Sequence, residues 1–184
     1  MKMYAGIGSR TTPAHALSIM REVASRIIER DFALRSGGAI GADTAFMIGA
    51  LASGGMIELY LPWNTYETWI PTYKNKDSKI KPQQSSQVII SENPSIQALE
   101  HASNFHPNWP ACTQGAQKLH ARNSEIVLGK NLDDPVSCIV CWHTDSGGTM
   151  QATRIATKLR IPMLNLSKNK KSIEEILDWM NDPV

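Results

Sequence analysis

The sequence predicts an α/β fold, a Rossmann-like parallel sheet with helices on both faces and a mid-chain insertion. Short apolar segments that are typical of buried strands alternate with segments of helical periodicity, which favours a parallel sheet. Glycine-rich turns follow three of the expected strands. The chain of 184 residues has 42% hydrophobic and 20% charged residues, which suits a globular domain with one core.

The first part of the chain is expected to form three strands and two helices. The first helix has one apolar face, with Thr12 as its expected cap and Pro13 at its first position. A second helix is expected from about Asp43 to Ala52. The strands are expected at residues 3–7, 32–36 and 57–61.

The last part of the chain continues the alternation. Helical periodicity covers residues 115–128 and a segment that ends near residue 159, and strands are expected at 138–142 and 162–166. Ser172 is expected to cap a final helix through a capping box with Glu175.

Residues 62–113 interrupt this pattern and are rich in proline and tryptophan. We expect an elaboration of the core, with a short strand at 88–90 and a helix at 94–102, so that residues 1–184 form a single domain. The basic run from Lys74 to Lys81 is either a solvated loop or a contact for a nucleic-acid backbone or an acidic ligand.

Composition limits the classes of function. The net charge of +2 is too small to indicate nucleic-acid binding by itself, and no apolar run approaches the ~20 residues of a membrane span. No signal peptide is visible, so a cytoplasmic location is expected. Three cysteines do not make a disulfide framework, and Cys138 and Cys141 should face opposite sides of a strand. The scattered histidines lack metal-site spacing, so neither a metal nor a cofactor is expected.

The three glycine-rich turns are the main functional signal. In a parallel sheet they all lie at the carboxyl edge, where open α/β folds bind ligands. Glycines let the backbone approach a ligand, and helix N-termini offer free N–H groups to an anion such as phosphate. The residues expected to bind are Gly8, Ser9 and Arg10; Ser36, Gly37, Gly38 and Gly41; and Ser146, Gly147, Gly148 and Thr149.

Other side chains near these turns have two interpretations each. Asp43 and Asp145 either stabilise helix N-termini or bind ribose hydroxyls, and Arg122 and Asn123 either reach the site or lie on a solvated helix face. Two tryptophans at strand ends either stack on a base or close the core; they are Trp63 and Trp142.

The first two turns resemble a known family. Tyr4–Arg10 has a G-S-R turn and Leu34–Asp43 has an S-G-x-A-x-G-x-D pattern, which resemble the DprA/Smf branch of the SLOG superfamily. Ser146–Ala152 is similar to a later turn of that family, and 115–128 resembles a segment of its stand-alone, phage-type members. The resemblance covers roughly residues 3–61 and 115–166. It implies a Rossmann-like domain that binds nucleotides or nucleotide-derived molecules.

Members of this superfamily have different functions, and three hypotheses follow. The first is a sensor or sequestering protein for a phosphorylated, nucleotide-type small molecule such as an ADP-ribose-like ligand. The second is a DprA-like single-stranded DNA-binding recombination mediator. The third is a LOG-like hydrolase of N-glycosidic bonds, which would need Asp43, Glu58 or Asp145 as its carboxylate, because Ala152 stands at the position of the LOG glutamate. We therefore favour binding over catalysis, and a homo-oligomer is compatible with the family.

Overall fold

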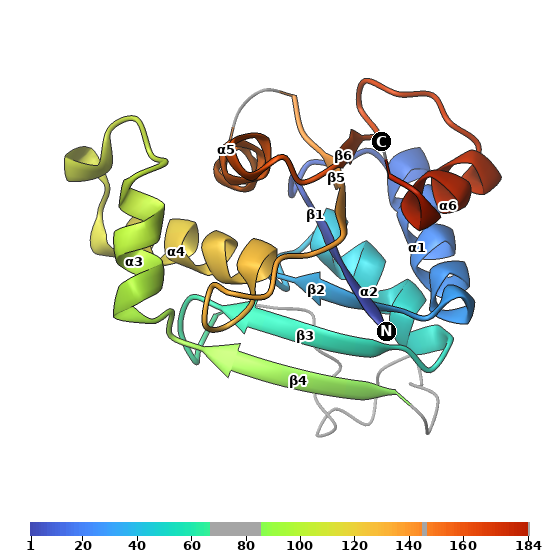
Figure 1. Cartoon of the computed structure of the whole chain (residues 1–184), viewed down its shortest axis with the longest axis horizontal. Coiled ribbons are helices and arrows are strands. Elements are labelled where there is room, and N and C mark those ends of the chain that lie inside the picture. Colours follow the sequence, from blue (N-terminus) through green and yellow to red (C-terminus); the bar gives the residue numbers. More distant parts are fainter. Residues whose placement is uncertain (67–85, 145–146, 184) are drawn as a thin grey trace.

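The computed structural model describes residues 1–66, 86–144 and 147–183 (Figure 1). Six strands form one sheet in the order β4-β3-β2-β1-β5-β6, and every neighbouring pair is parallel. This confirms the predicted fold class. The strands are β1 (Lys2–Gly8), β2 (Phe32–Ser36), β3 (Met56–Leu61), β4 (Gln87–Glu92), β5 (Cys138–Trp142) and β6 (Met163–Asn165).

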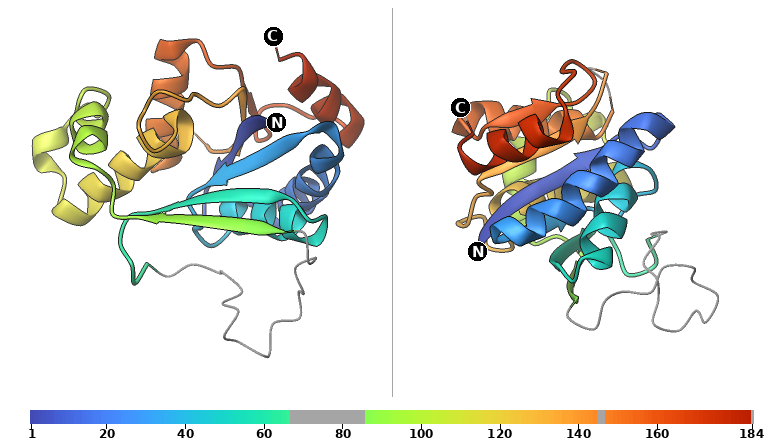
Figure 2. Two further views of the ribbon diagram at one scale, coloured as in Figure 1. Left: turned by 60° about the horizontal axis from the view of Figure 1, so that its bottom comes forward. Right: turned by 90° about the vertical axis from the view of Figure 1, so that its right-hand side faces the viewer.

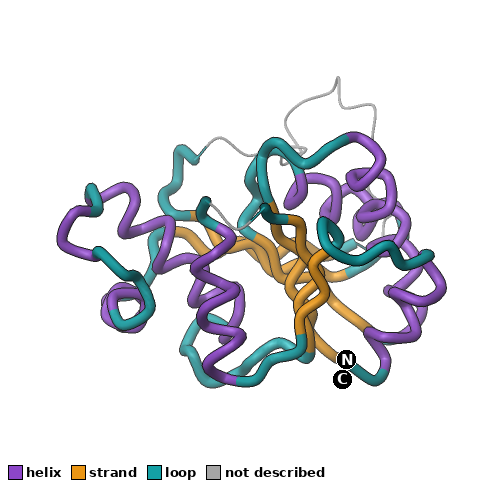
Figure 3. Tube along the Cα trace, turned by 90° about the horizontal axis from the view of Figure 1, so that it is seen from above, coloured by secondary structure: helices purple, strands orange, loops and turns teal. Residues whose placement is uncertain are grey.

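Helices cover both faces of the sheet (Figure 3). One face packs against α1 (Ala14–Ile27), α2 (Ala42–Ala52) and α6 (Ile173–Asn181). The other face packs against α4 (Gln114–Leu128) and α5 (Thr149–Leu159). A further helix, α3 (Ile96–Ser103), packs on α4, and two short 3-10 helices are η1 (Ile28–Arg30) and η2 (Trp109–Ala111).

Side chains alternate between the two faces along each strand, as the pleat of a strand requires. Tyr4 packs toward α1 and α2, whereas its neighbour Ala5 packs toward α4 and α5. Cys138 and Cys141 also lie in different core clusters, which confirms that they cannot act as a pair. Burial raises the pKa of each of these two thiols to about 12, so both are protonated and inert.

The beginning of α1 differs from the prediction. The helix starts at Ala14 with Pro13 as its N-cap, and no side chain caps it. Thr12 is buried and its hydroxyl donates to the Ser9 carbonyl at 2.7 Å. The predicted Thr12 cap is therefore wrong, because this hydroxyl is hydrogen-bonded within the turn after β1 and does not cap the helix. The capping box of Ser172 and Glu175 on α6 is confirmed.

The mid-chain insertion contributes to the sheet. Its strand β4 pairs with β3 over six residues at the edge of the sheet, and Figure 2 shows the two strands side by side. The predicted strand and helix of this segment are both present as β4 and α3. The basic run from Lys74 to Lys81 lies outside the described residues. Within the part of the chain that is described, no helix is long and apolar enough to cross a membrane.

The strand order creates a crevice at β1. This strand pairs with β2 on one side and β5 on the other. Strands β2 to β4 are added outward on the first side, and β5 and β6 are added outward on the opposite side. Open α/β sheets bind ligands beyond the carboxyl ends of the strands at such a switch point.

Candidate functional site

A cleft of about 510 Å³ lies at the carboxyl edge of the sheet. Each of the three predicted glycine turns contributes to its lining, and so does the buried side of α4. The topology brings these segments together because β1, β2 and β5 are neighbours and all run in the same direction. The lining comprises residues 7–11, Ala39 and Asp43, Trp63 and Tyr66, Leu119, Arg122 and Asn123, and residues 147–149.

Backbone contacts hold the turns against one another. The Ser9 amide donates to the Trp142 carbonyl at 3.0 Å, and the Ala42 amide donates to the Ser9 carbonyl at 3.4 Å. Gly41 has a φ of 101°, and a Cβ at this position would lie 2.7 Å from the Ser9 carbonyl oxygen. Only glycine permits this close approach, so the turn after β2 fixes the turn after β1.

Asp43 organises the floor of the cleft. One carboxylate oxygen accepts from the Gly8 amide at 3.0 Å, and the other accepts from the Ala39 amide at 3.3 Å. Burial raises the pKa of this carboxyl above its ordinary value, although the Arg122 guanidinium and the nearby amides favour the charged form. Each oxygen therefore has a backbone amide partner in the loops, and the contact with ribose hydroxyls stays a prediction.

Arg122 is a buried cation in the wall of the cleft. Its side chain donates to the Gly37 carbonyl at 2.6 Å, and its guanidinium lies 5.6 Å from the centre of the Tyr66 ring. Its Nε is buried and has no hydrogen-bond partner among the described residues. A Cβ on Gly37 would overlap this guanidinium, so the glycine makes room for the arginine. The structure thus places Arg122 at the site and excludes a solvated face.

Asn123 connects α4 to the third glycine turn. Its side-chain amide donates to the Gly148 carbonyl at 2.9 Å, next to the first residue of α5. Gly147 and Gly148 are exposed, and a Cβ on either would meet no atom within 4 Å. The backbone here is open to a ligand, and the N-terminus of α5 offers free N–H groups to an anion.

Two aromatic residues border the cleft just after β3. The rings of Trp63 and Tyr66 meet edge to face, with centroids 5.3 Å apart, and both side chains are half-buried. The exposed parts of the two rings therefore lie in the cleft, near Arg122. Sequence reasoning identified Trp63 but missed Tyr66, although the spacing Trp63-x-x-Tyr66 after a strand was a usable signal.

Some predicted residues do not reach the cleft. Ser36 is fully buried and its hydroxyl donates to the Gly6 carbonyl at 2.7 Å, so it joins strands and is unavailable to a ligand. Gly38 is also buried, outside the lining. Trp142 lines a separate cavity of about 280 Å³, where its ring meets His15 edge to face. Asp145 and Ser146 lie outside the described residues.

Of the carboxylates considered for glycosidic-bond hydrolysis, Asp43 and Glu58 have partners within the protein, and Asp145 lies outside the described residues. Asp43 is the only carboxylate in the described lining of the cleft, and its oxygens are occupied. Glu58 lies outside this lining and accepts from Arg35 at 2.6 Å. Ala152 lies on the buried face of α5, in the core.

Comparisons with known proteins bear on the family and the fold. The sequence model of the family described as DNA recombination-mediator protein A matches residues 1–173, including the insertion. The solved structure of DNA processing protein A from Helicobacter pylori is similar, with a TM-score of 0.54 and 19% sequence identity. The match covers 98% of this chain and 73% of that chain, and it shows a shared fold. That protein binds single-stranded DNA. No curated protein sequence matches the chain.

Proposed function

Since the chain belongs to the DNA recombination-mediator protein A family, we propose that it binds single-stranded DNA through the cleft at the carboxyl edge of its sheet. The observation that carries this proposal is the convergence of three glycine turns, two arginines and two aromatic rings on one cleft. Phosphate and base surfaces alternate along a single strand of DNA. The cleft offers groups suited to each of them.

The phosphate side of the cleft is cationic and rich in backbone amides. Arg10 is exposed in the turn after β1, while Arg122 retains an Nε without a hydrogen-bond partner among the described residues. A phosphate between them would also meet the open backbone of Gly147 and Gly148 and the N-terminus of α5. Hydrogen bonds between an arginine and a phosphate are charge-assisted and about twice as strong as neutral ones.

The aromatic side of the cleft suits an unpaired base. Trp63 and Tyr66 stand beside Arg122, at the edge where β3 ends. Stacking of a base on an aromatic side chain is worth about 1–3 kcal/mol and tolerates every base. Duplex DNA keeps its bases stacked on each other, so this contact favours single strands.

The proposal can be tested with a fluorescein-labelled oligothymidine and anisotropy measurements over a range of salt concentrations. Two cations line the described part of the cleft, so log K should fall against log salt with a slope of about −1.4 or steeper. A duplex of the same length should compete poorly. Absence of oligothymidine binding at low salt would sink the proposal.

A nucleotide-type small molecule is the second candidate, favoured by the size of the cleft. A volume of about 510 Å³ falls within the range of about 300–1,000 Å³ that is usual for small-molecule sites. Calorimetry with mononucleotides, dinucleotides and ADP-ribose separates the two functions. Affinity that rises with oligonucleotide length supports DNA, whereas affinity that is complete at the mononucleotide supports a small-molecule ligand.

A further inference from the structure

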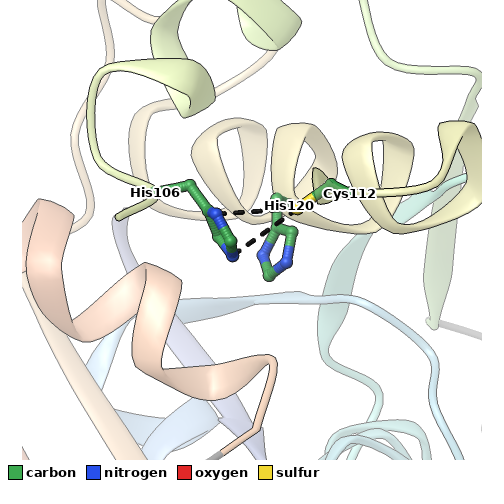
Figure 4. A group of neighbouring side chains, drawn as sticks. All are labelled: His106, Cys112 and His120. Atoms are coloured by element: carbon green, nitrogen blue, oxygen red, sulfur yellow. Dashed lines mark hydrogen bonds between the residues drawn. The ribbon is translucent and has the colours of Figure 1, made fainter. Parts of the chain in front are cut away.

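Three potential metal ligands meet beside α4, outside the lining of the cleft. His106 lies between α3 and η2, Cys112 follows η2, and His120 lies on α4. Figure 4 shows the two imidazole rings beside each other, with the cysteine sulfur next to them. One ligand atom from each residue lies within 4.8 Å of the others, and all three side chains are half-buried. Sequence motifs do not predict this cluster, because its spacing, H-x₅-C-x₇-H, fits no familiar metal motif.

The distances in the cluster suit a tetrahedral ion. Sulfur and nitrogen ligands stand about 2.3 Å and about 2.0 Å from zinc, which places them about 3.5 Å from each other at tetrahedral angles. The Cys112 sulfur lies 3.6 Å from Nδ1 and 3.7 Å from Nε2 of His106. The ring centroids of His106 and His120 are 4.4 Å apart, and one ligand atom of each of the three residues lies within 4.8 Å of the others.

The hydrogen bonds around the cluster leave imidazole nitrogens that could coordinate a metal ion. The Asn108 amide donates to Nδ1 of His106 at 3.3 Å, which orients that ring and leaves Nε2 for coordination. Nδ1 of His120 is buried and lacks a hydrogen-bond partner among the described residues. A buried polar atom without a partner is costly, and a metal bond would satisfy it.

We propose that His106, Cys112 and His120 bind a zinc ion, with the fourth position open to water. One thiolate and two imidazoles form a donor set that suits zinc, which accepts nitrogen and sulfur ligands in a tetrahedron. The ion would tie the segment between α3 and η2 to α4. Arg122 and Asn123 follow His120 on the same helix, so the ion would brace the wall of the cleft. The evidence for this metal site does not depend on the proposed DNA binding, and the experiment that tests it uses no nucleic acid.

Cobalt is a visible probe for this site. The full-length protein is first freed of metal with a chelator and then titrated with Co²⁺. We expect one equivalent to bind, with the visible bands of tetrahedral cobalt and a thiolate-to-cobalt charge-transfer band in the near ultraviolet. Zinc should displace the cobalt and abolish both signals. A titration without a charge-transfer band overturns the proposal.

Substitutions of the three residues test which side chains coordinate the metal ion. Cys112→Ser should lose the charge-transfer band, and His106→Gln and His120→Gln should each weaken binding by at least about tenfold. His15→Gln is the matched control, since His15 lies beside Trp142, far from the cluster in the fold. A charge-transfer band that persists undiminished in Cys112→Ser assigns the thiolate elsewhere and contradicts the proposal.

A second readout works on the unmodified protein. Zinc at about a hundredfold excess over its dissociation constant should raise the melting temperature by roughly 5–10 °C. It should also slow the reaction of Cys112 with a thiol reagent by about tenfold or more, because a coordinated thiolate is shielded. The other two cysteines are buried and will react slowly in either case. Equal rates with and without zinc would refute coordination by Cys112.

Discussion

Two buried arginines in this molecule have opposite surroundings. Arg35 on β2 and Arg122 on α4 are 3% and 8% exposed. Arg35 donates to the Glu58 carboxylate at 2.6 Å, and it also donates to the carboxylate and the carbonyl of Asp134. Its charge and its hydrogen-bond donors are satisfied within the protein.

Arg122 is only partly satisfied. Its one direct hydrogen bond goes to the Gly37 carbonyl, and it forms no ion pair within 4 Å among the described residues. One buried guanidinium is fully satisfied, whereas the other has an Nε without a partner among the described residues, so the two arginines have different roles. The first cation holds strands and loops together, while the second remains available to an anionic ligand.

The largest expected effect tests the structural arginine. Arg35→Met leaves the partly buried Glu58 carboxylate without its cation and removes the hydrogen bonds of the guanidinium to Glu58 and Asp134, which should cost about 3 kcal/mol of unfolding free energy. Urea denaturation measures this loss. Arg30→Met is the control, because its ion pairs with Glu174 and Asp178 involve exposed carboxylates and should contribute less than about 1 kcal/mol. Equal losses in the two variants would contradict the contrast.

The next effect tests the binding arginine. Arg122→Met should weaken oligothymidine binding by about 10- to 100-fold, the value of a charge-assisted hydrogen bond, while unfolding free energy falls by about 1–2 kcal/mol, because the Gly37 carbonyl loses its donor and Asp43 loses a nearby cation. Lys118→Met removes a cation from the same helix outside the cleft lining and should leave affinity nearly unchanged. If Arg122→Met instead lowers stability as much as Arg35→Met and leaves binding intact, the two roles are wrongly assigned.

A smaller effect sharpens the account of how Arg122 is held. Tyr66→Leu removes the ring beside the guanidinium, whose attraction is worth about 0.5–1 kcal/mol at a partly exposed site. Oligothymidine affinity, measured by anisotropy, should fall by about fivefold, because a base also loses one of its two proposed stacking surfaces. Tyr66→Phe keeps the ring and should bind nearly as well as the unmodified protein. A Phe variant as weak as the Leu variant would point to the hydroxyl instead.

The smallest effect concerns the exposed cation of the cleft. Arg10→Ala should change unfolding free energy by less than about 0.5 kcal/mol, because the side chain is exposed. The slope of log K against log salt should become shallower by about 0.7, the contribution of one phosphate of a single strand. An unchanged slope would remove Arg10 from the interface.

Much of the fold was predictable from local patterns. Apolar runs and helical periodicity gave the strands and helices, and the insertion yielded both its strand and its helix. The glycine turns were predictable as well, since parallel strands end at one edge and the sequence marks those ends. Thr12 was misassigned because capping rules consider a helix alone, whereas the neighbouring turn takes this hydroxyl.

Side-chain partners over long sequence distances were not predictable. Gly37 and Arg122 are 85 residues apart in sequence, and nothing in either segment identifies the other as a partner. The same holds for Arg35 and Asp134, which are 99 residues apart. These contacts depend on how α4 and its neighbouring loop lie across the sheet, and that placement results from packing of the whole core.

The sequence by itself determined the alternation of strands and helices, and with it the edge at which the glycine turns open. The physical reason is that periodicity and turn chemistry act over a few residues. Only the tertiary structure decided which polar groups are consumed internally and which are left over. Among the described residues, Asp43 accepts from backbone amides, the Nε of Arg122 has no hydrogen-bond partner, and His106, Cys112 and His120 meet in one cluster. Such outcomes require distances of a few ångströms between segments that the chain brings together only when it folds.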